Sequence, residues 1–261
     1  MKKSFLIRSS SAGSLDRIQL VHDPDLDLLP DKITQDIFRT RWKKLNQDRK
    51  LSGKPPLKDC PLFRPGSVRQ RSDINIIHCG LTSYMTTSLL ASPCTGWHVN
   101  TLGAGLSIVP VCSDRRILIG RRSGVVYQGK DLFHVAAGHA HPKTNFQTEP
   151  DSLTGAALQE LDEEMAIQSS DIIQMDFLGT GLDLTTSKTE FITRVFLNET
   201  SDTYIRRWKT TAGLHPCREF DEITTVNTIT GKDSIELHEH SFTVACRMAL
   251  KAHESAETER V

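Results

Sequence analysis

Residues 157–167, ALQELDEEMAI, contain three glutamates spaced three and four residues apart: Glu160, Glu163 and Glu164. Residues at these separations are neighbours on one surface of an α-helix, so the three carboxylates would project to one side. The chain has no lysine or arginine between residues 151 and 175 to offset them, and like charges at this spacing are mildly destabilising. The spacing favours two interpretations equally. The residues are either an acidic helix face in water or a cluster that binds a divalent cation such as magnesium, which prefers carboxylate oxygens.

The segments around the glutamates have the pattern of a compact α/β unit. Strands are predicted at residues 103–113, 115–123 and 131–142, and the third runs into a glycine-containing loop. After an excursion at 143–150, a helix is predicted over 151–167, where Asp151 or Ser152 can cap it. Paired strands at 171–184 and 188–198, a strand at 221–228 and a helix at 234–254 complete this part.

The N-terminal part has a different pattern. Strands are predicted at 4–8 and 16–22, followed by an amphipathic helix over 31–51, a Pro/Gly-rich connector at 51–67 and a strand at 73–84 with a turn at Gly80. The helix has an apolar stripe of Ile33, Ile37, Phe38, Trp42 and Leu45. Its basic residues on the other face are better explained as a solvated surface than as a phosphate site. We therefore predict two domains, residues 1–100 and 101–261.

The composition excludes several classes of function. Lys plus Arg and Asp plus Glu are both 32, so the net charge is zero, which argues against a nucleic-acid-binding protein. No run of 18 apolar residues predicts a membrane span, and the apolar run at residues 5–7 is too short for a secretory signal. The six cysteines match no zinc pattern. We expect an intracellular, cytoplasmic protein.

The glutamate stretch resembles the Nudix box, whose helix reads Arg-Glu-U-x-Glu-Glu-x-Gly-U, with U an apolar residue. Residues 159–167 match all three glutamates and both apolar positions. Three positions depart from the family pattern: Gln159 stands at the arginine, Ala166 at the second glycine and Ala137 at a loop glycine. The spacing from Gly138 to Gln159 is longer than in the family, so residues 143–150 look like an insertion.

A narrower resemblance is to the UDP-glucose and UDP-galactose pyrophosphatase branch of the Nudix hydrolases. Three collinear segments carry it: GLTSY at 80–84, AGHAHP at 137–142 and LQELDEE at 158–164. The resemblance spans roughly residues 30–250. It implies a Nudix-type mixed-sheet α/β/α sandwich with a smaller N-terminal α/β domain.

The resemblance also implies a chemistry. Magnesium, with manganese as an alternative, would be held by Glu160 and Glu164, then Glu163, with a carbonyl oxygen of Ala137 or Gly138 added. The expected reaction is hydrolysis of a UDP-hexose to UMP and a hexose 1-phosphate. The expected partner is therefore a small nucleotide sugar; the oligomeric state is left open.

Further residues are expected to bind substrate. Arg121 and Arg122 are adjacent on a strand, so one should face phosphate and the other solvent. Gly138 and His139 belong to the glycine loop, where His141 completes an H-x-H pair. A second H-x-H pattern, at residues 238–240, is expected at the surface.

Three more candidates have structural roles as alternatives. Glu190 is a lone strand carboxylate that could act as a base, as a second metal ligand or in a structural ion pair. Thr82 and Tyr84 could contact the nucleotide, or could belong to a turn that packs the N-terminal part on the core.

Two other functions remain as alternatives. One is hydrolysis of a different nucleoside diphosphate derivative, such as ADP-ribose. The other is a catalytically silent Nudix-fold module that binds a nucleotide or a protein, which the loss of the box arginine and glycine at Gln159 and Ala166 would explain.

Overall fold

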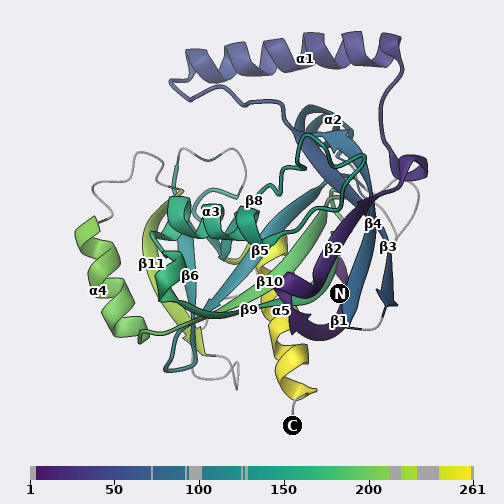
Figure 1. Ribbon diagram of the computed structural model, residues 1–261. Helices are drawn as coiled ribbons and strands as arrows, with labels where there is room; N and C mark the ends of the chain where they lie inside the picture. The colour runs from purple at the N-terminus through teal and green to yellow at the C-terminus, as the bar shows by residue number, and fades with distance from the viewer. Residues whose placement is uncertain are drawn as a thin grey trace.

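The computed structural model describes residues 4–71, 73–91, 93, 102–124, 126, 129–211, 219–227 and 241–259. Over these residues the chain forms two β-sheets and five α-helices (Figure 1). The larger sheet contains both parallel and antiparallel strand pairs. The predicted mixed α/β fold class is confirmed.

Eight strands make up the larger sheet. They are β1 (Phe5–Ser14), β5 (Ala104–Val111), β6 (Arg116–Arg122), β7 (Phe133–His134), β8 (Ala136–Gly138), β9 (Ile172–Asp183), β10 (Thr189–Leu197) and β11 (Phe220–Asn227). Six of them follow the order β1-β9-β10-β5-β6-β11. The strand regions predicted from residue 103 onward are confirmed, although the third is divided into β7 and β8.

The sheet forks between β5 and β6. These neighbours share one register pair, Val111 with Ile117, next to the turn that connects them. Beyond that pair β8 lies against β5 and β7 lies against β6. The two arms of the sheet therefore separate toward the end where Gly105 and Arg122 lie.

Helices α3 (Thr154–Met165) and α5 (Val244–Thr258) cover opposite faces of this sheet (Figure 1). Leu161 of α3 packs in one buried cluster with Phe191 of β10, whereas Met248 of α5 packs in a second cluster with Ile192. Adjacent strand residues point to opposite faces, so β10 supplies both layers. The buried residues of α3 are apolar: Ala157, Leu161 and Met165.

A smaller three-stranded sheet, in the order β2-β4-β3, belongs to the N-terminal part. Its elements are β2 (Ile18–His22), β3 (Pro61–Arg71) and β4 (Ile74–Ser83), accompanied by α1 (Lys32–Leu51) and α2 (Tyr84–Leu90). The predicted helix at 31–51 is confirmed. Its apolar stripe is only partly buried: Phe38 and Trp42 are covered, but Ile33 and Ile37 are 76% and 48% exposed. The reason is that α1 packs on α2 through one narrow side, where Trp42 meets Tyr84 edge-on at 5.8 Å.

Three local predictions in the N-terminal part and before α3 are wrong. The second half of the connector 51–67 is strand β3. Gly80 lies inside β4, where a Cβ would overlap the backbone of Leu26, so the glycine allows close chain approach. Neither Asp151 nor Ser152 caps α3, because its N-cap is Leu153. The backbone of Asp151 instead pairs with Leu20 in both directions, and its carboxylate accepts from the N–H of Lys143. Two helices, α2 and α4 (Ser201–Thr211), were not predicted.

The C-terminal helix starts later than expected. The structure describes α5 from Val244, after the Thr243 side chain accepts a hydrogen bond from the N–H of Cys246. The predicted helical residues 234–240, with the H-x-H pattern at 238–240, lie outside the described residues. No helix in the described part of the chain has the length and apolarity needed to cross a membrane.

The division into domains at residue 100 stays a prediction. The small sheet, α1 and α2 all precede that position, but β1 pairs with β9 of the larger sheet from Phe5 opposite Asp183 to Ser14 opposite Asp176. The N-terminal strand is thereby held to the part of the chain that carries the glutamates.

Candidate active site

The carboxylates of α3 lie against the backbone of β8 and the residue after it. Glu164 Oε2 accepts a hydrogen bond of 2.8 Å from the N–H of Ala137, and Glu160 Oε1 accepts one of 3.3 Å from the N–H of His139. Gly138 lies between these two donors, where a Cβ would overlap the Glu160 carboxylate. Close approach therefore requires a glycine at this position. Two of the three glutamates face the protein rather than solvent.

The third glutamate has a different environment. Glu163 is exposed, and its Oε1 accepts a 2.7 Å hydrogen bond from Nε2 of Gln159, one turn earlier. Ala166, where the box has glycine, ends the helix with a φ of 53°. An L-residue in this left-handed region is strained by about 1 kcal/mol. Gln159 and Ala166 both depart from the box. Gln159 nevertheless donates a hydrogen bond to a glutamate, and Ala166 nevertheless ends the helix in the left-handed conformation.

A third carboxylate, that of Glu219, lies beside Glu160 and Glu164. Glu219, immediately before β11, lies against Glu164, and its other neighbour is Arg122, whose Nη2 is 3.3 Å away. Burial raises the pKa of Glu160 to about 7, and repulsion from Glu163 adds to the shift. Burial, followed by the charge and hydrogen bond of Glu219, raises the pKa of Glu164 well above its ordinary value. The carboxylates are crowded, and among the described residues Arg122 pairs with Glu219.

The carboxylates around Glu164 have the donor type that a magnesium site requires. Among the described residues, no three His, Cys, Asp or Glu side chains surround a common point as a metal cage does. The chemistry of the donors nevertheless fits a hard cation, because Glu160, Glu164 and Glu219 are oxygen ligands whose mutual repulsion a divalent ion would relieve.

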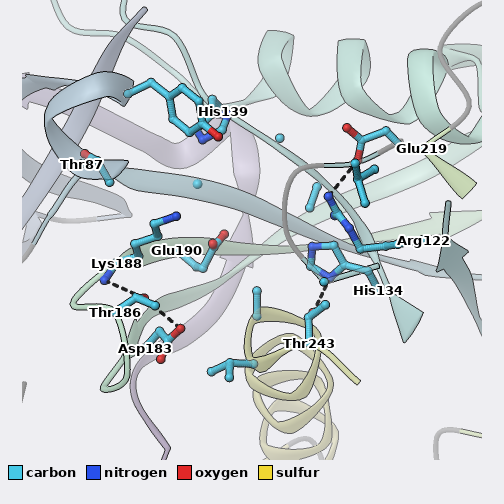
Figure 2. Close-up of a pocket in the computed structure, with 18 of the residues that line it drawn as sticks. Thr87, Arg122, His134, His139, Asp183, Thr186, Lys188, Glu190, Glu219 and Thr243 are labelled. Atoms are coloured by element: carbon cyan, nitrogen blue, oxygen red, sulfur yellow. Dashed lines mark hydrogen bonds and ion pairs between the residues drawn. The ribbon is translucent and has the colours of Figure 1, made fainter. Parts of the chain in front are cut away.

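A cavity of about 850 Å³ lies beside this cluster, at the open end of the fork (Figure 2). Its wall includes the exposed ends of β5 to β8, the C-terminal end of α1, Tyr84 of α2 and the first turn of α5. Of the glutamate triplet, Glu160 lines the cavity. The volume is in the range of small-molecule binding sites.

The two adjacent arginines point in different directions, as expected for neighbours on a strand. Arg121 is directed outward and forms an exposed ion pair with Glu222 at 3.4 Å. Arg122 lines the cavity and pairs with Glu219 (Figure 2). Arg122 is therefore the one of the pair that is placed to meet a substrate.

Tyr84 and His139 form an aromatic wall of the cavity. Their rings meet edge-on with centroids 4.7 Å apart. Burial, with the charges of His141 and Lys188, lowers the pKa of His139 to about 4, so its ring is neutral at pH 7. His141 is exposed, with its ring 6.4 Å from that of His139. Thr82 is buried and does not line the cavity.

Glu190 lies on β10 in the cavity wall. Its Oε2 accepts a 3.1 Å hydrogen bond from the hydroxyl of Ser107 on the neighbouring strand β5. Burial raises the pKa of Glu190 to about 7, against the stabilising effects of Ser107 and Lys188. The carboxyl group therefore changes its protonation state close to neutral pH.

Several cavity residues were missed by the sequence analysis. They are Lys188, Thr186, His134, Thr243 and Glu219. His134 Nδ1 and the Thr243 hydroxyl lie 2.9 Å apart, and burial beside Arg122 lowers the pKa of His134 to about 3. Only Lys188 had a local signal, because it stands two residues before Glu190 and follows a turn.

Comparisons with known proteins give a likeness of fold. No family model matches the chain, and no curated protein sequence matches it. Similar solved structures include a Nudix hydrolase from M. smegmatis (13% identity, 60% of this chain and 84% of that chain, TM-score 0.36). A MutT protein from Methanosarcina mazei (14%, 60% and 94%, TM-score 0.37) and an Ap4A hydrolase from C. elegans (14%, 60% and 98%, TM-score 0.35) are further examples. At these values the likeness carries no argument about function, which depends on the residues described above.

Proposed function

We propose that this chain is a metal-dependent hydrolase of the Nudix type that acts on a nucleoside diphosphate derivative. Its substrate is a UDP-hexose such as UDP-glucose or UDP-galactose, and the products are UMP and a hexose 1-phosphate. The observation that carries the proposal is the placement of Glu160 and Glu164 on the backbone around Gly138, at the edge of a cavity of about 850 Å³.

Glu160 and Glu164 would hold the magnesium ion, with Glu219 beside them. When bound, magnesium supplies neutralisation of the diphosphate charge and a lower pKa for a coordinated water. The N–H groups of Ala137 and His139 restrict the two carboxylates to one orientation, so little reorganisation would be needed on binding. Gln159 does the same for Glu163 from the exposed side.

The remaining cavity groups suit the other parts of the substrate. Arg122 is directed into the cavity and can pair with a phosphate oxygen, with Glu219 holding its guanidinium in place. The neutral rings of Tyr84 and His139 offer a stacking surface for a base. Tyr84 ends the GLTSY segment and His139 belongs to AGHAHP, so two of the three segments that resemble the UDP-sugar branch contact one another.

A nucleotide-binding module without catalysis is the second candidate, motivated by Gln159 and Ala166. The local geometry speaks for the enzyme, because Gln159 still donates to a glutamate and Ala166 still closes the helix in the left-handed region. A binding module would also gain nothing from the repulsion among Glu160, Glu164 and Glu219.

The test is incubation of the purified protein with magnesium and a panel of nucleotide sugars, followed by chromatography of the products. We expect UMP from UDP-glucose, lost with EDTA and in Glu164→Gln, and kept in Glu222→Gln, which changes an exposed carboxylate outside the cavity. Cleavage of ADP-ribose alone would replace the UDP-hexose with another substrate. Stabilisation by a nucleotide without turnover would identify the binding module.

A further inference from the structure

The turn between β9 and β10 brings a polar group of side chains to one side of the cavity. Thr186, Lys188 and Glu190 all line it, next to Asp183. In Figure 2 these residues gather on the side away from Arg122, His134 and Glu219. The carboxylates assigned to magnesium and the group at the turn are therefore separate parts of one cavity wall.

This turn is held in a fixed conformation by Asp183. Its Oδ1 accepts hydrogen bonds from the N–H and hydroxyl of Thr185, at 2.7 and 2.6 Å, and its Oδ2 accepts from the Thr186 hydroxyl at 2.9 Å. Ser187 has a φ of 62°, and its N–H donates to the Asp183 carbonyl. Both carboxylate oxygens of Asp183 are thus used within the turn, which fixes the position of Lys188 just before β10 and of Glu190 in its first residues.

Gly105 leaves space for the Glu190 carboxyl group. In the register of the sheet, Gly105 of β5 and Gly181 of β9 lie directly opposite it on its two neighbouring strands. A Cβ on Gly105 would come within 2.7 Å of both Glu190 oxygens, so any larger residue there would displace the carboxyl group. Among the described residues the hydrogen-bond partner of Glu190 is Ser107, which contacts Oε2. The half-buried carboxyl group lines the cavity and has further acceptor capacity that the hydroxyls of a ligand can use.

The charges of Asp183, Lys188 and Glu190 favour a neutral ligand over an ion. A cation would be repelled by Lys188, and a phosphate would be repelled by Glu190 and Asp183, so a neutral ligand is favoured. Lys188 offers N–H donors and Glu190 offers oxygen acceptors, which suits a group rich in hydroxyls. Met248 of α5 lines the same cavity and presents an apolar surface to the C–H face of a ring.

A nucleobase is the other neutral group in the substrate, but it fits this side less well. The aromatic residues that line the described part of the cavity are Tyr84, His139 and His134, and none belongs to the β9–β10 turn. A base gains from stacking, which Tyr84 and His139 can provide. A pyranose gains chiefly from hydrogen bonds to its hydroxyls, which Lys188 and Glu190 can provide.

On the basis of the proposed function, we propose that Lys188 and Glu190 form the hexose subsite of the cavity, with Asp183 fixing the turn that presents them. In this assignment the sugar hydroxyls bind to Lys188 and Glu190, and the nucleoside lies toward Tyr84 and His139. The two residues then determine affinity for the sugar half of the substrate and leave the nucleotide half unaffected.

The test measures the two product halves separately, by calorimetry in magnesium, so that it does not depend on turnover. UMP and glucose 1-phosphate are titrated into the wild type, Glu190→Gln, Lys188→Met and the control Glu222→Gln. We expect the Kd for glucose 1-phosphate to rise by about tenfold in the two cavity variants, because each removes a buried hydrogen-bond partner. The Kd for UMP should change by less than about twofold, and the control should match the wild type.

The outcomes distinguish failure of the hexose assignment from failure of the proposed function. Weaker UMP binding with unchanged glucose 1-phosphate binding would place the nucleoside at Lys188 and Glu190 and overturn the hexose assignment. Unchanged binding of both ligands would also overturn it. If the wild type binds neither half, the proposed function itself fails. Glu190→Gln preserves the side-chain shape, so it remains informative if Lys188→Met does not fold.

Discussion

Gly138 and Glu160 approach so closely that the carboxylate occupies the position where residue 138 would carry a Cβ. The Glu160 side chain of α3 can therefore lie against the backbone of β8 only because Gly138 has no Cβ. The N–H bonds to Glu160 and Glu164 on either side depend on this fit.

Gly138→Ala should displace the Glu160 carboxylate and lower kcat for the proposed hydrolysis by about a hundredfold, as expected for a shift of about 1 Å in a reacting group. The matched control is Gly155→Ala in helix α3, which carries Glu160; a Cβ at residue 155 would meet nothing within 4 Å. That variant should keep full activity and gain up to about 1 kcal/mol of stability. Equal loss in both variants would show that the close approach has no catalytic consequence.

Gln159 should act as a positioning residue for Glu163. Gln159→Ala removes the 2.7 Å hydrogen bond and should lower kcat by about tenfold with KM little changed. Gln159→Arg restores a donor that can reach Glu163 and should recover activity. A kinetic comparison of the three proteins decides this, and failure of the arginine variant to exceed the alanine variant would contradict it.

The buried ion network under α5 should contribute strongly to stability. Arg194 is fully buried and donates at 2.6 Å to Asp176 and at 2.6 Å to Glu257 of α5. Arg194→Met leaves Asp176 buried without its cation and should lower the free energy of unfolding by about 3–5 kcal/mol. Arg121→Met breaks the exposed pair with Glu222 and should cost less than about 1 kcal/mol. Urea denaturation measures both.

Glu190 should make stability depend on pH. Its pKa is raised by burial to about 7 from the ordinary value of 4.5. The folded state thus holds a proton that the unfolded state has released between these values, and stability falls as pH rises from about 4.5 to about 7. This fall in the free energy of unfolding amounts to about 2 kcal/mol after allowance for the partial exposure of Glu190.

Glu190→Gln should remove this component. Urea denaturation of the variant from pH 5 to pH 8 should show a weaker decline than the wild type, with greater stability above pH 7. Glu222→Gln, which changes an exposed carboxylate, should retain the decline of the wild type. An identical pH profile in all three proteins would mean that Glu190 ionises in the folded state as it does in the unfolded chain.

Local sequence patterns were enough to predict most of the helices and strands and to suggest that the three glutamates bind a metal ion. Periodicity predicted the helix that carries Glu160, because its apolar face repeats at helical spacing, and alternation predicted the strands from residue 103. Helix boundaries were less accessible, since Asp151 is used in a tertiary pairing with Leu20 rather than in a cap.

The rest of the site depends on contacts between distant segments. Glu219 is more than fifty residues from Glu164, and nothing in its local pattern marks it as a neighbour of that residue. The direction of Arg122 rather than Arg121 follows from the register of β6 with β11, which a single sequence does not contain. Lys188 is the exception, because the turn that places it in the cavity is formed by local hydrogen bonds to Asp183.

The fork between β5 and β6 has a consequence for how this scaffold can change. The two arms are joined by one register pair, while their outer edges are fixed by β10 and β11. A small change in the angle between the arms would therefore widen or narrow the cavity while the pairings with β10 and β11 stay intact. Gly138 of β8 is a fixed point in such a change, because Glu160 occupies the place of its Cβ.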